Sequence, residues 1–202
     1  MATPEARNNS GNSSTPVHYI GVDPSLNGTG LAVLTFDEGS VRRSTLLIAP
    51  STSLSEPYRL AHIYRVASEW LVAVTPGHIA GACMEGASYG SKGRQDILSE
   101  VRGVLKVVLV QRPRLQRLNI VAPTSLKKFA SGYGGADKEQ VAEGMRKLGW
   151  HANSSDEYDA AALAEFCYAQ CNDNPQLSRT QKEALVPKKR PAKKKFAPGY
   201  NV

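Results

Sequence analysis

The sequence predicts an α/β domain with a mixed five-stranded sheet flanked by helices. Three strand-like segments follow one another through short turns near the start of the chain, and helix-like and strand-like segments alternate after them. This order is typical of three meandering strands followed by parallel strands with crossover helices. Of the 202 residues, 41% are hydrophobic and 21% are charged, so the chain can bury a substantial core.

Each expected strand is a short run of mostly apolar residues bounded by turn residues. The run VHYIGVD ends at Asp23, where a Pro-Ser pair and two nearby glycines make a polar turn. The run IAGACME ends at Glu85 and leads into a glycine-containing turn. The five expected strands cover residues 17–23, 29–36, 41–49, 79–85 and 118–122.

The expected helices carry apolar residues at intervals of three and four. The segment 56–74 shows this spacing clearly through Leu60, Ile63, Ala67 and Leu71. The segment 95–111 is apolar on more than one face near its end, which fits either a core helix or a helix shared with a second subunit. The remaining expected helices cover residues 124–130, 138–148 and 156–170.

Positive charge is concentrated at the C-terminal end. The chain has 25 Lys and Arg against 18 Asp and Glu, a net charge of +7, and residues 172–202 hold eight basic and two acidic residues, which leaves +1 for the remainder. We expect a disordered polar segment over 1–16, one folded domain over 17–171, and a mostly unstructured Pro- and Lys-rich tail over 172–202. Such a tail would contact nucleic acid through phosphates, with a solubilising role as the alternative.

Several classes of protein are disfavoured by composition. No run of about 18 apolar residues is present, so no membrane span is expected, and the first residues lack the apolar stretch of a secretory signal. Three cysteines without a C-x-x-C pair argue against a disulfide framework or a zinc knuckle and fit a reducing compartment. We expect a cytoplasmic protein, acting in the host cytoplasm if it is phage-encoded. A nuclear or organellar location is the alternative, because KKRPAKKK resembles a nuclear address.

Four acidic residues occupy positions suited to a shared site. If the strands ending at Asp23 and Glu85 are parallel neighbours, the two side chains emerge together at the carboxyl edge of the sheet. Near the last helix, Ser154 followed by a glutamate three residues later makes a capping-box pattern, and Asp156 and Asp159 then share one face of the first turns. Each acid alone is more often a turn former or a helix-dipole partner, so the prediction rests on their conjunction.

A cluster of carboxylates calls for cations, because like charges held close together repel. Oxygen ligands without His or Cys at matching spacing favour Mg²⁺ or Mn²⁺ over zinc. Two such ions about 3.5–4 Å apart can activate a water and stabilise both the attacking and the leaving oxygen of a phosphodiester. The acids therefore predict a two-metal phosphodiesterase.

The motifs resemble those of the RuvC-type Holliday-junction resolvases in order, spacing and wording over residues 18–169. The matching segments are IGVDPSLNGTG, CMEGASYG, SEVRGVL, VAPTSLKKFASGYGGADKEQV and DEYDAAALA. The resemblance implies a ribonuclease H-like fold, a homodimer, and hydrolysis of phosphodiesters at four-way DNA junctions with Mg²⁺, for which Mn²⁺ can substitute. It also implies that residues 17–171 form the nuclease domain.

Family roles carry over to particular positions of this chain. The four acidic ligands fall on Asp23, Glu85, Asp156 and Asp159, and the two basic residues beside the scissile phosphate fall on Lys138 and on either Lys127 or Lys128. This chain has Ser88 where the family places an aromatic residue at the junction centre, and Tyr89, one position later, is a candidate for contacting DNA.

Further cations in the same regions are candidates for DNA contacts. Lys92 and Arg94 follow the glycine-containing turn after Glu85 and could grip phosphates flanking the cut, with a solvated loop as the alternative. Two other functions stay open on the residues alone. One is a module that holds branched DNA without cutting it, and the other is an ATP-binding protein of the actin and sugar-kinase type, whose phosphate loop resembles GVDPSLNGTG.

Overall fold

The computed structural model describes residues 15–87, 95–113, 115–172 and 176–186. Its elements follow the expected order, with boundaries within a few residues of those inferred from sequence. The strands are β1 (Val17–Asp23), β2 (Thr29–Asp37), β3 (Ser40–Ile48), β4 (His78–Glu85) and β5 (Leu118–Val121). The helices are α1 (Glu56–Val74), α2 (Gln95–Val110), α3 (Pro123–Ser131), α4 (Lys138–Lys147), α5 (Ser155–Cys171) and α6 (Arg179–Leu185).

The strands form one five-stranded mixed sheet in the order β3-β2-β1-β4-β5. The first three strands pair antiparallel, whereas β1 pairs parallel with β4 and β4 pairs parallel with β5. The predicted fold class is therefore confirmed. Because β1 and β4 run in the same direction, the ends of these strands, at Asp23 and Glu85, reach the same edge of the sheet.

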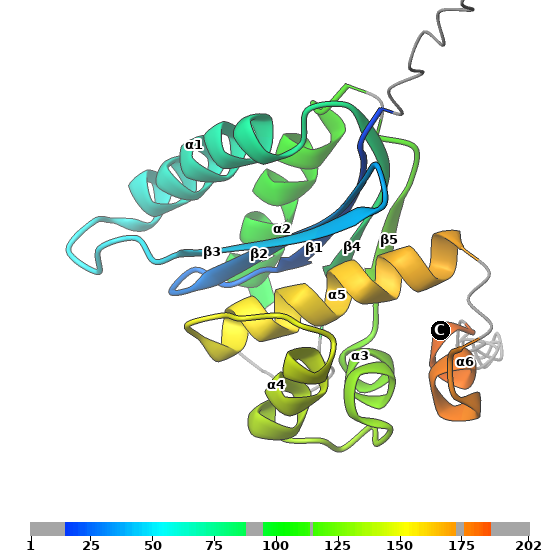
Figure 1. Ribbon diagram of the computed structural model, residues 1–202. Helices are drawn as coiled ribbons and strands as arrows, with labels where there is room; N and C mark the ends of the chain where they lie inside the picture. Colours follow the sequence, from blue (N-terminus) through cyan, green and yellow to red (C-terminus); the bar gives the residue numbers. More distant parts are fainter. Residues whose placement is uncertain (1–14, 88–94, 114, 173–175, 187–202) are drawn as a thin grey trace, which may run out of the picture.

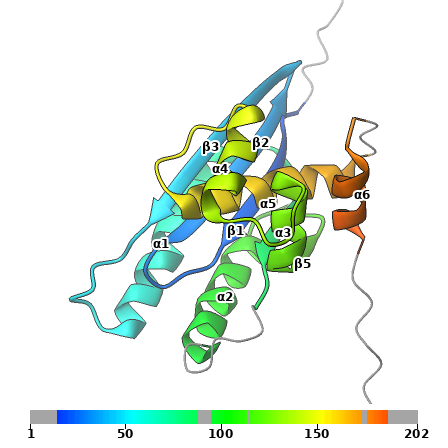
Figure 2. The same ribbon diagram turned by 90° about the horizontal axis from the view of Figure 1, so that it is seen from below.

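Helices cover both faces of the sheet (Figure 1), with α1 and α2 on one face and α5 across the other. Alternate residues of each strand serve the two cores, as in β1, where Ile20 packs with the α1 and α2 side and Tyr19 packs with the α5 side. The helices α3 and α4 pack against α5, which Figure 2 shows from below. This arrangement sandwiches the sheet and leaves its carboxyl edge open to the start of α5.

Helix α5 lies unusually close to the sheet because two strand glycines face it. A Cβ on Gly21 would lie 2.5 Å from the Ala164 nitrogen, and a Cβ on Gly30 would lie 2.6 Å from the Asp156 carbonyl carbon. No side chain larger than hydrogen fits at either position without displacing backbone. The alanine-rich sequence of α5 matches this close approach, since Ala160, Ala161 and their neighbours in the helix are fully buried.

The segment after α5 corrects one expectation. We expected mostly unstructured chain from residue 172 onward, but α6 lies within that segment and packs against α3. Ser178 and Gln181 form a capping box that starts the helix, and Ala184 is buried in the core on the α5 side. The sequence did not predict this helix, because the high net charge of the tail is typical of unstructured chain and α6 contains few apolar residues.

The terminal parts of the predicted organisation lie outside the described residues. These are residues 1–14 of the polar N-terminal segment and 187–202 of the basic tail. Among the described helices, none has both the length and the hydropathy required to cross a membrane.

Candidate active site

Asp23 and Glu85 meet at the carboxyl edge of the sheet, as predicted. Asp23 is 8% exposed at the end of β1, and the turn after it is held by Ser25, whose hydroxyl oxygen accepts from the Asn27 and Gly28 N–H groups at 3.3 Å. Its carboxyl group is hydrogen-bonded to that of Glu85 at the end of β4. Parallel pairing of the two strands thus places two acids side by side.

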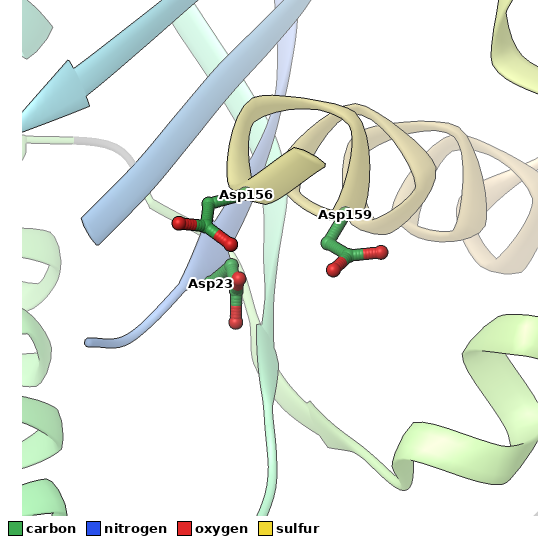
Figure 3. A group of neighbouring side chains, drawn as sticks. All are labelled: Asp23, Asp156 and Asp159. Atoms are coloured by element: carbon green, nitrogen blue, oxygen red, sulfur yellow. The ribbon is translucent and has the colours of Figure 1, made fainter. Parts of the chain in front are cut away.

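The start of α5 brings two more acids to the same place. Ser154 caps the helix, its hydroxyl oxygen accepting from the Glu157 N–H at 3.2 Å. Carboxylate oxygens of Asp23, Asp156 and Asp159 all lie within 4.8 Å of one another. Figure 3 shows the three side chains as neighbours, with Asp156 and Asp159 extending from α5 and Asp23 from the end of β1. Residues 133 positions apart in sequence therefore form one carboxylate cluster.

The cluster is electrostatically strained in the ionised form. Burial, followed by the charge of Glu85, raises the pKa of Asp23 well above its usual range. Burial also raises the pKa of Glu85, which the hydrogen bond with Asp23 lowers in part, and it raises the pKa of Asp159 to about 6. Three oxygen donors spaced for one ion, with burial penalising the charge of Asp23 and Asp159, fit a hard divalent cation.

Two lysines border the acids, and a third turns away. The Lys138 ammonium donates to Asp156 Oδ1 and to Ser155 Oγ, both at 2.9 Å. Lys127 in α3 lies close enough to lower the pKa values of Glu85 and Asp159. Lys128 instead donates to a Glu183 oxygen of α6 at 2.7 Å. Of the adjacent pair, Lys127 is therefore the one beside the carboxylates.

Comparison with known proteins places this geometry in a family. The sequence model of the family described as "Crossover junction endodeoxyribonuclease RuvC" matches residues 19–166, which include all four acids and the lysines beside them. The chain belongs to the RuvC family. This match confirms the family, and with it the nuclease class, expected from the sequence motifs.

Relatives in the RuvC family come from several organisms. The RuvC endodeoxyribonuclease of Chloroherpeton thalassium is 30% identical over 131 residues, 64% of this chain and 68% of the relative. That of Corynebacterium glutamicum is 27% identical over 174 residues, 83% of this chain and 75% of the relative. The structure of Thermus thermophilus RuvC in complex with a Holliday junction substrate has a TM-score of 0.63 at 21% identity, over 77% of this chain and 95% of that chain. This likeness shows the ribonuclease H-like RuvC fold.

Several predicted DNA contacts fall outside the described residues. These are Tyr89, Lys92 and Arg94, together with Ser88, which occupies the position of the family's aromatic residue. Their proposed contacts with DNA stay predictions.

Sequence reasoning missed one cation beside the acids. Arg102 of α2 donates to the Gly86 carbonyl oxygen at 3.4 Å and lowers the pKa of Glu85. Its neighbour Val101 is buried, so Arg102 is a charged residue beside an apolar face of α2. That contrast between an arginine and its apolar surroundings was the available signal.

Proposed function

We propose that this RuvC-family chain is a metal-dependent endonuclease that resolves four-way DNA junctions by hydrolysing one phosphodiester in each of two opposed strands. The observation that carries the proposal is the convergence of four acids, Asp23, Glu85, Asp156 and Asp159, at one edge of the sheet. A module that only holds branched DNA would not need this complete set. The family match favours cutting over the ATP-binding alternative.

The carboxylates are the proposed metal ligands, with Mg²⁺ as the ion, Mn²⁺ as a substitute, and two ions per site. When bound, such ions lower the pKa of an attacking water and neutralise charge on the attacking and leaving oxygens of the phosphodiester. Asp23, Asp156 and Asp159 supply oxygens near enough together to share one ion. Glu85, whose carboxyl group neighbours that of Asp23, is proposed to contribute to a second ion.

The lysines are proposed to act on the phosphate. Lys138 already faces the cluster through its hydrogen bond with Asp156, and its side chain is 64% exposed, so an incoming phosphate can reach it. Lys127 approaches the acids from the α3 side. Positive groups positioned where charge develops stabilise the transition state more than the bound substrate. Lys128 is proposed to contact DNA farther from the scissile bond after its release from Glu183.

A homodimer is part of the proposal because a four-way junction has two-fold symmetry and two strands to cut. On α2, Val107 and Val110 are 46% and 64% exposed, while Leu105 and Leu109 are buried in the protomer. The exposed valines support the proposal that one face of α2 packs in the core and another face contacts a second subunit. The cytoplasm, where bacterial or phage DNA is accessible, is the proposed location.

A junction-cutting assay tests the function. We expect cleavage of a synthetic four-way junction, and not of the matching linear duplex, only when Mg²⁺ is present. Asp23→Asn, Glu85→Gln, Asp156→Asn and Asp159→Asn should each lower the cutting rate by at least about 100-fold, because each removes a charge on which metal binding depends. Junction binding in a gel-shift assay should survive these changes.

A matched control for the four variants is Asp37→Asn, at the far end of β2, where the carboxylate pairs with Arg42 at 3.5 Å. It should cut like the wild type. Cutting at a near wild-type rate by any of the four site variants would remove that residue from the proposed ligand set.

A further inference from the structure

Glu157, at the start of α5, carries a carboxylate that bonds to residues outside the cluster of Asp23, Asp156 and Asp159. Glu157 is 3% exposed, and its Oε1 accepts from the Thr45 hydroxyl at 2.8 Å. Its Oε2 accepts from the Ser154 hydroxyl at 2.9 Å and from the Asn153 N–H at 3.1 Å. Both carboxylate oxygens of Glu157 therefore accept hydrogen bonds from neutral donors, and we call this set of contacts the Glu157 anchor.

This anchor joins the helix start to the edge of the sheet. Thr45 lies in β3, 112 positions earlier in the chain, while Ser154 both donates to the Glu157 carboxylate and accepts from the Glu157 N–H at 3.2 Å. The helix cap and the contact with β3 thus form one hydrogen-bonded unit. Loss of the Thr45 hydroxyl would leave a buried carboxylate oxygen without its donor, which is costly.

Helix geometry connects the anchor to the catalytic acids. Each residue of an α-helix advances by about 100° around the axis, so Asp159 projects about 60° from Asp156 on one side. Glu157 projects about 100° from Asp156 on the other side. Because Glu157 is bonded to Thr45 of β3, the first turn is held in one orientation about the helix axis. In that orientation both aspartates lie on the side of Asp23.

At the first turn of α5, glycines of the sheet face the helix backbone. Helix α5 approaches β2 through Gly30, where the nearest atoms are the Asp156 carbonyl group, and Gly28 faces the Asp156 carboxylate, 2.9 Å from an added Cβ. These contacts limit how near the helix can come to the sheet. Gly28 and Gly30 offer the first turn no side chain, so Glu157 supplies a side-chain constraint there in addition to the core packing of residues such as Leu163 and Phe166 farther along α5.

We infer that Glu157, held by Thr45, is a positioning residue that orients Asp156 and Asp159 for metal binding. The inference rests on the proposed role of those aspartates as metal ligands. Groups that orient metal ligands without touching the ion commonly change metal affinity or activity by about 10–100-fold when removed.

The test is direct Mn²⁺ binding to the full chain, measured by calorimetry without DNA, beside junction cutting as a function of Mg²⁺ concentration. Thr45→Val keeps the side-chain shape and removes the donor, so we expect the Mn²⁺ dissociation constant and the half-maximal Mg²⁺ concentration to rise by about tenfold. Thr45→Ser restores a hydroxyl and should return both quantities to within about twofold of the wild type. Glu157→Gln, in which one acceptor oxygen becomes a donor, should weaken Mn²⁺ binding in the same direction and serves if Thr45→Val does not fold.

The matched control is Thr35→Val, which removes a buried hydroxyl bonded to His18 Nδ1 at 2.9 Å, at the opposite end of the sheet. It should lower the melting temperature and leave Mn²⁺ affinity unchanged. If Thr45→Val behaves like this control, losing stability with unchanged Mn²⁺ affinity, the positioning role is wrong. A wild-type chain that bound no Mn²⁺ would contradict the proposed function itself, and the inference with it. Failure of the proposed function therefore shows in the wild-type protein, whereas failure of the positioning role alone shows in the Thr45→Val variant.

Discussion

Replacing Gly21 by alanine should damage both stability and cutting, because this β1 glycine lies directly under α5. An added Cβ would lie 2.5 Å from the Ala164 nitrogen, and the Ala160 carbonyl oxygen would be closer still. A normal contact between such atoms is about 3.5 Å, so helix and strand would have to separate by about 1 Å. Both opposing atoms belong to the backbone, which has no rotamer to change.

The expected cost follows from that displacement. Overpacking a well-filled core commonly costs 1–3 kcal/mol, and a clash with backbone belongs at the upper end, about 3 kcal/mol. For a domain of this size each kcal/mol corresponds to roughly 2–4 °C, so the melting temperature should fall by about 6–12 °C. Because Asp156 and Asp159 move with α5, the rate of junction cutting by the folded protein should fall by about 100-fold.

Thermal melting and single-turnover cutting at a temperature where both proteins are folded measure the two effects. Gly103→Ala is the matched control, since its added Cβ would meet no atom within 4 Å in the middle of α2. Alanine is the better helix former by about 0.5–1 kcal/mol, so this variant should melt about 1–4 °C higher. It is a control for stability alone, because Gly103 shares the face of α2 that carries the exposed Val107 and Val110. A Gly21→Ala protein with wild-type melting and cutting would refute the claim that close backbone packing positions the site.

Other perturbations separate the remaining roles. Lys127→Ala should lower the single-turnover rate by about 100-fold and junction affinity much less. Lys128→Ala loses the pairing with Glu183 but no charge beside the carboxylate cluster, so it should change that rate by less than about threefold; equal effects would contradict the assignment. Burial raises the pKa of Asp159 to about 6, so the folded state binds more protons than the unfolded state between about pH 4 and 6. Stability without metal should therefore fall as pH rises through that window, and Asp159→Asn should reduce the slope of melting temperature against pH. Deleting residues 188–202 removes six basic residues and should flatten the slope of log affinity against log salt by up to about 0.9 per phosphate contact, with junction preference unchanged; an unaltered slope would leave the tail without a role in DNA binding.

Much of the fold could be predicted because its signals are local. Apolar runs that end in turn residues mark β1 and β4, and the same pattern marks Asp23 and Glu85 as strand-end acids. Parallel pairing of two such strands brings their ends together whatever the details of packing. The helix cap at Ser154 likewise depends on only a few adjacent residues. It fixes where α5 begins and therefore where its aspartates lie along the helix.

The capping pattern also shows where local reasoning fails. The sequence paired Ser154 with Glu157 in a capping box, and Ser154 does accept from the Glu157 N–H. The Glu157 carboxylate, however, accepts from the Asn153 N–H and from Thr45 of β3. A side chain chooses its partner among all donors within reach, and donors from distant strands do not appear in a local pattern.

By itself, then, the sequence determined the order of strands and helices, the four acids at element ends, and the family motifs that contain them. Only the tertiary structure decided which of two adjacent lysines faces the acids, since that depends on a Glu183 partner 55 positions away. It alone also decided that α6 packs against α3 and that Thr45 anchors the start of α5. The physical reason is the range of the interactions: strand and helix patterns arise from neighbours in the chain, whereas the direction of a side chain at the site is set by contacts that exist only after the chain has folded.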